Sequence, residues 1–182
     1  MIGDRSLRPY DLSLIEVLVV DDSPHMLKLL RLILSSMEIR TVHCIGEPES
    51  ALDQIKALRP HLVITDILMQ PIDGLALTKE IRGCGDGFVR FTPVFVLSGF
   101  TDRAHVLEAC NAGAHAALAK PVSPKTLYQR IHALIEHPPN FIETPSYFGP
   151  ERRTRSASSP LAASEDASFG DEEAEYLDID VA

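Results

Sequence analysis

The stretch EVLVVDDSP, residues 16–24, decides the fold of this chain. Its run VLVV has the continuous apolar character that a β-strand covered on both faces requires. Asp21 and Asp22 follow directly, and Ser23 before Pro24 is typical of the first residues of a helix. The stretch therefore predicts a buried strand that leads past two carboxylates into a helix.

The same order of strand, polar residue and helix recurs along the chain. Strands are predicted at Glu16–Val20, Thr41–Ile45, His61–Thr65, Pro93–Leu97 and Ala114–Ala119. Helices are predicted around residues 27–37, 52–55, 77–84, 102–111 and 127–135. Because a helix follows each strand, the pattern predicts a doubly wound α/β fold with a five-stranded parallel sheet and five helices.

Polar residues follow four of the predicted strands at the point where each strand ends. They are the pair Asp21-Asp22, then Asp66, Ser98 and Lys120. Taken alone, each is as readily a turn former, a helix cap or an exposed terminal residue. The carboxyl ends of parallel strands, however, meet in one crevice, which is where ligands bind in such folds. Together these residues predict a site suited to a divalent cation and a phosphoryl group.

The chemistry of such a site assigns a role to each side chain. Asp66 is the candidate nucleophile, a carboxylate that attacks phosphorus to form an aspartyl phosphate. Because a carboxylate and a phosphoryl group repel each other, a cation is required. Asp22 and Asp66 would ligate Mg²⁺, with Asp21 reaching it through water. Lys120 would supply a second positive charge, and Ser98 a hydroxyl donor that follows the phosphate.

The chain resembles the receiver domain of two-component response regulators over about 15–136. Four segments carry the resemblance, namely VLVVDDSP (17–24), LVITDILM with the later DG (62–74), PVFVLSG (93–99) and AGAHAALAKP (112–121). It implies a flavodoxin-like strand order of 2-1-3-4-5 and a cis bond between Lys120 and Pro121. It also implies that a sensor histidine kinase or a phosphotransfer protein phosphorylates Asp66. The backbone carbonyl of Leu68 would be a further ligand of Mg²⁺.

The chain departs from the family pattern beside the predicted site. Gln70 stands where the family usually has proline, and Ala117 stands where it usually has an aromatic residue. Leu68 is apolar where some relatives carry a side chain that orients water. Since Leu68 and Phe100 would crowd the approach of water to Asp66, we expect a long-lived phosphorylated state.

We expect three parts in the chain: an N-terminal extension over residues 1–14, the receiver domain over residues 15–137, and a flexible acidic tail over residues 138–182. Pro138 and Pro139 stop the last helix. After them the sustained apolar periodicity of the domain is lost, which sets the predicted boundary.

The acidity of the chain is concentrated in the tail. Residues 1–137 carry 16 acidic and 14 basic residues, whereas residues 138–182 carry 10 acidic and 3 basic ones. The segment Ser156–Ser168 has the small polar composition of a flexible linker. The acidic stretch 165–182 has too few apolar residues to order itself. Its carboxylates either fold over basic parts of the domain or stay solvated.

Composition narrows the class of function. A nearly neutral domain with an acidic tail lacks the basic surface of a nucleic-acid-binding protein. No apolar run reaches the length of a membrane span, and the N-terminus lacks the apolar stretch of a signal peptide. We therefore expect a cytoplasmic protein without nucleic-acid or membrane partners. Cys44, Cys84 and Cys110 are too widely spaced to predict a disulfide framework or a zinc site.

The sequence leaves the output of the chain open. No segment after His137 resembles a helix-turn-helix, cyclase or methylesterase domain, so we expect no enzyme. We expect a stand-alone response regulator that signals through an unknown protein effector. The alternative is a phosphorylation-independent scaffold that binds through the receiver surface and the acidic tail. The arginines at 152, 153 and 155 form a solvated loop or dock a partner.

Overall fold

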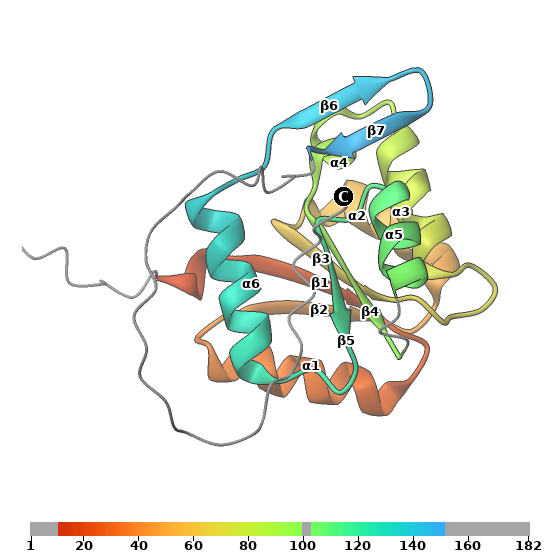
Figure 1. Ribbon diagram of the computed structural model, residues 1–182. Helices are drawn as coiled ribbons and strands as arrows, with labels where there is room; N and C mark the ends of the chain where they lie inside the picture. Colours follow the sequence, from red (N-terminus) through yellow and green to blue (C-terminus); the bar gives the residue numbers. More distant parts are fainter. Residues whose placement is uncertain (1–10, 100–102, 152–182) are drawn as a thin grey trace, which may run out of the picture.

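The computed structural model describes residues 11–99 and 103–151 of the chain (Figure 1). These residues form one parallel sheet flanked by helices, followed by a small hairpin. In chain order the elements are η1 (Leu12–Leu14), β1 (Glu16–Val20), α1 (Pro24–Ser36), β2 (Thr41–Ile45), η2 (Pro48–Ser50), α2 (Ala51–Leu58), β3 (Leu62–Asp66), α3 (Gly74–Gly83), α4 (Gly87–Phe91), β4 (Val94–Ser98), α5 (Arg103–Asn111), β5 (Ala116–Ala119), α6 (Pro124–Glu136), β6 (Phe141–Thr144) and β7 (Tyr147–Pro150).

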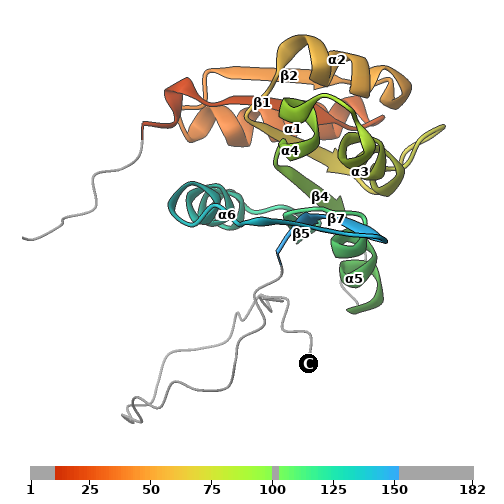
Figure 2. The same ribbon diagram turned by 90° about the horizontal axis from the view of Figure 1, so that it is seen from above.

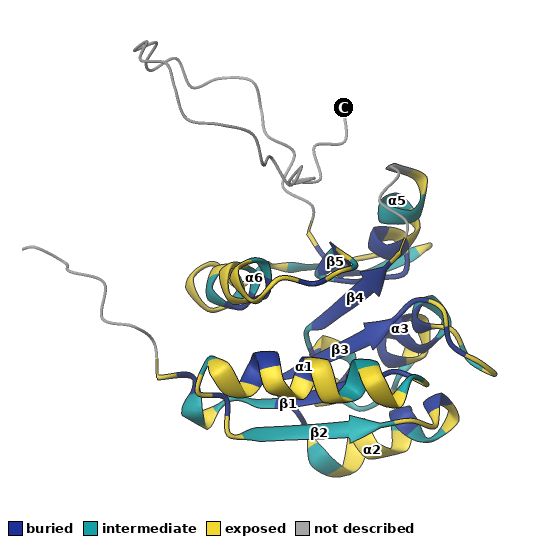
Figure 3. Ribbon diagram, turned by 90° about the horizontal axis from the view of Figure 1, so that it is seen from below, coloured by how far each residue is buried: buried dark blue, intermediate teal, exposed yellow. Residues whose placement is uncertain are grey.

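The main sheet has the order β2-β1-β3-β4-β5, and every neighbouring pair in it is parallel. This confirms the predicted doubly wound fold and its strand order. Helices cover both faces; in Figure 2, for example, α6 and α5 lie on opposite sides of β5. The central strands β1, β3 and β4 are buried along almost their whole length, whereas the edge strand β2 is half-buried (Figure 3).

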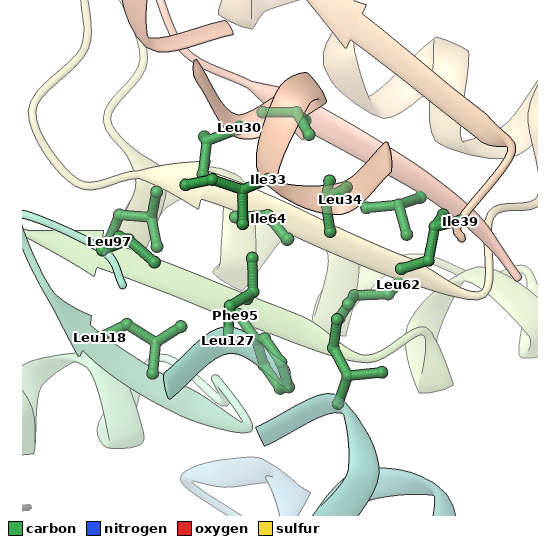
Figure 4. Packing of buried hydrophobic residues seen from close by; sticks show 14 of the residues in the cluster. Leu30, Ile33, Leu34, Ile39, Leu62, Ile64, Phe95, Leu97, Leu118 and Leu127 are labelled. Carbon is green, nitrogen blue, oxygen red and sulfur yellow. The ribbon is translucent and has the colours of Figure 1, made fainter. Parts of the chain in front are cut away.

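The core is divided by the sheet into two apolar clusters. Alternate residues of a strand point to opposite faces, so Val17 and Val19 join one cluster, and Leu18 and Val20 join the other. The first cluster packs α1 and α6 against the sheet, with Phe95 at its centre (Figure 4). The second packs α2, α3 and α5 against the other face. Burial of each large apolar side chain contributes about 1.5–3 kcal/mol.

Side-chain caps fix where the helices begin. Ser23 and Asp73 accept hydrogen bonds from backbone N–H groups in the first turns of α1 and α3. Ser123 does the same for α6. Such caps contribute about 1 kcal/mol each. They hold the first turns of α1, α3 and α6 next to the carboxyl ends of β1, β3 and β5, where the predicted site lies.

The prediction that the chain is flexible from residue 138 onward needs correction, although α6 ends at Glu136, next to the predicted boundary. β6 and β7 form an antiparallel hairpin within the segment predicted to be flexible, with Phe141 opposite Pro150. Two strands of four residues are marginal by themselves. Contacts with the domain stabilise them, because the rings of Phe141 and Phe148 pack edge-on against Phe91 at 4.8 and 5.3 Å between centroids. Residues 152–182 lie outside the described part of the chain.

Two smaller differences concern the helices. The structure has a short helix, α4, that was not predicted, so six α-helices rather than five occur within residues 11–99 and 103–151. Asp86 caps α4 by accepting hydrogen bonds from the N–H groups of Phe88 and Val89. None of the helices in the described ranges has the length and apolar composition of a membrane-spanning segment.

Candidate functional site

The sheet brings the predicted polar residues to one edge. Asp66 is the last residue of β3 and lies in register with Leu97, one residue before Ser98 at the end of β4. Asp21 directly follows β1, and Lys120 directly follows β5. The edge formed by the carboxyl ends of these four strands therefore holds the candidate site.

Lys120 joins the two acidic residues of the site. Its Nζ lies 2.8 Å from Oδ2 of Asp66 and 3.5 Å from Oδ2 of Asp21. The lysine backbone is fixed as well, since its N–H donates to the carbonyl of Ser98 at 2.7 Å. The bond from Lys120 to Pro121 is cis, as the family resemblance implied. A single ammonium group thus faces two carboxylates.

Asp21 is the most buried carboxylate of the site, with 1% of its surface exposed. Burial raises the pKa of its carboxyl group, and the nearby charge of Asp66 acts in the same direction. The N–H of Ser23, at 2.8 Å from Oδ1, and the Lys120 ammonium oppose that rise. Two carboxylates beside one lysine leave the site negatively charged, so that it attracts a further cation.

Asp22 is exposed, whereas Asp21 and Asp66 are buried. Within the described ranges no group of three acidic, histidine or cysteine side chains is placed to hold a metal. Successive side chains after a strand point to opposite sides, which explains why Asp21 is buried and Asp22 faces solvent. The predicted set of three carboxylates is thus not assembled in this structure.

The remaining donors still fit Mg²⁺. This ion commonly binds proteins through one or two carboxylates and keeps several waters. Asp21 and Asp66 supply the carboxylates, and their proximity through Lys120 is the structural observation that supports the fit. The Leu68 carbonyl belongs to the loop directly after Asp66 and could add one more oxygen ligand.

Gly74, which the sequence analysis did not single out as a site residue, positions Asp66. A Cβ atom at residue 74 would lie 2.0 Å from the backbone oxygen of Asp66, so only glycine allows this approach. The Gly74 N–H donates to the carbonyl of Ile67 at 3.0 Å. The first turn of α3 is thereby held against the backbone of the nucleophile. The Asp-Gly pair at 73–74 is the sequence signal for this contact.

The other residues discussed from the sequence lie around this edge. Ser98 is buried, with 4% of its surface exposed, and Ala117 is half-buried and packs against the second apolar cluster. The side chain of Leu68 is 60% exposed. Phe100, predicted to lie beside it, is outside the described residues.

Comparison with known proteins identifies the family. A family model described as the response regulator receiver domain matches residues 17–132. The chain belongs to this family.

Curated relatives share the receiver part with this chain. The DNA-binding response regulator MtrA of Mycolicibacterium smegmatis is 32% identical over 117 residues, which cover 64% of this chain and 49% of that protein. The protein-glutamate methylesterase/protein-glutamine glutaminase of Nitrosospira multiformis is 36% identical over 112 residues, 59% of this chain and 30% of that protein. The chain thus matches about half or less of the length of these relatives.

Solved structures agree with the fold. A putative response regulator from Chloroflexus aurantiacus has a TM-score of 0.62 and 29% identity, covering 68% of this chain and 98% of its own. The chemotaxis protein CheY4 of Vibrio cholerae has a TM-score of 0.59 and 26% identity, covering 65% of this chain and 96% of its own. Both similarities cover the receiver part and nearly the whole of the other chain.

Proposed function

We propose that the chain is a response regulator that accepts a phosphoryl group on Asp66. The observation that carries the proposal is the Lys120 ammonium group between Asp66 and Asp21. The ammonium group lies against the proposed nucleophile, Asp66, at the edge of the sheet where Asp21, Asp66 and Lys120 come together. Family membership supports the same assignment.

The phosphoryl transfer follows from the chemistry of the carboxylate. An oxygen of Asp66 attacks the phosphorus of a phosphohistidine on a histidine kinase or phosphotransfer protein. The new O–P bond forms while the P–N bond breaks, and the electron pair of that bond returns to the imidazole nitrogen, which takes up a proton. Because little covalent chemistry is required of the receiver, positioning and charge neutralisation provide most of the catalysis.

Each remaining residue supports this transfer in a distinct way. Mg²⁺, held by Asp21 and Asp66, would neutralise charge on the phosphoryl oxygens. Lys120 moves from the free carboxylate to an oxygen of the phosphoryl group and stabilises its negative charge. Ser98 donates its hydroxyl hydrogen to the phosphoryl group and so couples phosphorylation to β4. Gly74 keeps the Asp66 backbone in place.

The output of the phosphorylated domain is a change in the surface that a protein effector binds. Phosphorylation shifts a two-state equilibrium through local charge and hydrogen bonding. The name of MtrA describes a DNA-binding protein, which is at odds with our prediction that this chain has no nucleic-acid partner. A cytoplasmic location fits a protein effector.

A phosphorylation-independent scaffold is the second candidate. The observation that favours it is Ala117, because a methyl group on β5 cannot move as the usual aromatic ring does. Incubation of the full chain with acetyl phosphate and Mg²⁺ separates the two functions. We expect one phosphoryl group per chain in the wild type and none in Asp66→Asn. A wild-type chain that stays unmodified would favour the scaffold.

A further inference from the structure

Helix α1 presents an exposed surface that combines leucines with cationic side chains. Much of α1 is coloured as exposed in Figure 3. Lys28, Leu29, Arg31 and Leu32 are exposed on this helix and form what we call the α1 surface. Positions three and four apart are neighbours on a helix, so Leu32 lies beside both Lys28 and Leu29. The helix contains no acidic residue. Its exposed side is therefore cationic and apolar.

No residue in the described part of the chain covers or neutralises this surface. Leu29 is 45% exposed and Leu32 is 69% exposed. Neither Lys28 nor Arg31 forms an ion pair with any residue in 11–99 or 103–151. On α2, by contrast, the cation Lys56 is paired with Asp53 at 3.2 Å. The α1 surface is thus available to an acidic partner that also carries apolar side chains.

The segment 165–182 of the same chain has that composition. It contains eight acidic residues and no basic ones. Apolar side chains are interspersed with the carboxylates, notably Tyr176, Leu177 and Ile179. A segment of this kind can pair its carboxylates with Lys28 and Arg31 while its apolar side chains cover the two leucines.

The connection is long enough for the segment to reach α1. Residues 152–164 join it to the end of the described region at Glu151. Thirteen extended residues span about 45 Å, whereas a domain of this size has a radius of gyration of about 14 Å. Tethering also raises the local concentration of the segment to the order of mM. Weak pairwise contacts are then sufficient for substantial occupancy.

We propose that the acidic segment 165–182 docks in cis on the α1 surface. The docking does not depend on the proposed function.

Nuclear magnetic resonance of the isotope-labelled full chain tests the docking. We compare backbone amide signals of residues 165–182 at ~50 mM and ~500 mM NaCl, since salt screens the charge pairs. In the wild type these signals should shift with salt. In Lys28→Gln/Arg31→Gln they should match the high-salt wild type already at low salt. The control Lys56→Gln/Lys79→Gln makes the same charge change on α2 and α3 and should behave as the wild type.

Two outcomes would overturn the proposal. One is that the α1 variant leaves the tail signals unchanged, or that the control variant alters them equally. The other is that the shifts grow with protein concentration, because docking would then occur between two copies of the chain. The measurement needs no phosphoryl transfer. A chain that shows the docking but is never phosphorylated would refute the proposed function and leave this inference standing.

Discussion

The two ends of the parallel sheet differ in how they stabilise buried charge. At the carboxyl ends of the strands, Asp21 and Asp66 share one lysine, which leaves an excess of negative charge. At the amino ends of β4 and β5, the guanidinium group of Arg82 is buried, and no carboxylate within the described ranges pairs with it. We call the region at the carboxyl ends of the strands, with its excess of negative charge, the open end. We call the region around Arg82 the closed end.

Backbone carbonyls satisfy the buried cation. Arg82 donates to the carbonyls of Gly113, Arg90 and Thr92, each at 2.9 Å. Its remaining nitrogen lies 3.2 Å from Nδ1 of His115, which also accepts from the N–H of Val94. Burial lowers the pKa of Arg82 to about 10, so the group stays charged at neutral pH.

The hairpin completes this closed end. The guanidinium group of Arg90 lies 3.7 Å from the ring centroid of Phe148, and that of Arg82 lies 5.3 Å from the ring centroid of Phe141. Figure 1 shows β6 and β7 at the end of the sheet where β4 begins. A site for a changing ligand thus keeps an excess of charge, whereas the structural junction pairs its buried arginine with backbone carbonyls.

The largest expected effect is on stability at the closed end. Arg82→Met keeps much of the apolar stem but leaves three carbonyls, two of them in buried hydrogen bonds, without their donor. Each unsatisfied group costs about 1–3 kcal/mol, so we expect a loss of roughly 3–5 kcal/mol in the free energy of unfolding. Urea denaturation measures it. Arg59→Met, which breaks a largely exposed ion pair with Asp86, is the control and should cost under about 1 kcal/mol. Equal losses would remove the contrast between the two ends.

At the open end we expect a substitution to affect the rate of phosphorylation more than stability. Lys120→Met removes the cation that meets the phosphoryl oxygens, and the rate of phosphorylation by acetyl phosphate should fall about 10²-fold. The free energy of unfolding should fall by less than in Arg82→Met, because a fifth of the lysine side chain is exposed and water can solvate Asp66 once the ammonium group is removed. Large destabilisation by this variant would mean that Lys120 is mainly structural.

The dependence of stability on pH tests the closed end, where His115 lies. Burial, followed by the charge of Arg82, lowers the pKa of His115 to about 3 from an ordinary value of 6.5. As pH falls below 6.5 the unfolded chain takes up a proton that the folded chain refuses. Stability should therefore fall by about 1.4 kcal/mol per pH unit between pH 6 and pH 4. His115→Gln should lack this component, and identical slopes in the two proteins would contradict the buried neutral imidazole.

The smallest expected effect concerns the lifetime of the phosphorylated state. Leu68→Asn places an amide that can orient water near Asp66, so dephosphorylation should accelerate several-fold. The decay of the phosphorylated full chain after removal of the donor measures this rate. Leu68→Ala is the matched control, since it relieves crowding without supplying a polar group. No acceleration in the asparagine variant would show that Leu68 does not limit hydrolysis.

Sequence patterns predicted the open end better than the closed end. The strand ends follow from apolar runs, and four of the five runs are followed by a polar residue predicted for the site. Spacing along the chain does not say which of two adjacent side chains turns inward, so the sequence did not distinguish Asp21 from Asp22. It was the burial of Asp21 that distinguished them.

The closed end depends on contacts that leave no local pattern. Arg82 sits in a helix whose charged residues would ordinarily face solvent, and nothing beside it predicts three carbonyl partners. The strands FIET and YFGP are too short for periodicity to identify. They are held by Phe91 and Arg90, which lie some fifty residues earlier in the chain. Such long-range packing becomes visible only in the folded structure.

The location of the phosphoryl group is the most direct test of the account. Borohydride reduces an aspartyl phosphate to homoserine, so mass spectrometry of the digested, reduced chain identifies the modified residue. After incubation with acetyl phosphate and Mg²⁺, we expect homoserine at position 66 in the wild type and at no position in Asp66→Asn. Homoserine at another aspartate, or an unmodified residue 66 in a folded and phosphorylated chain, would contradict it.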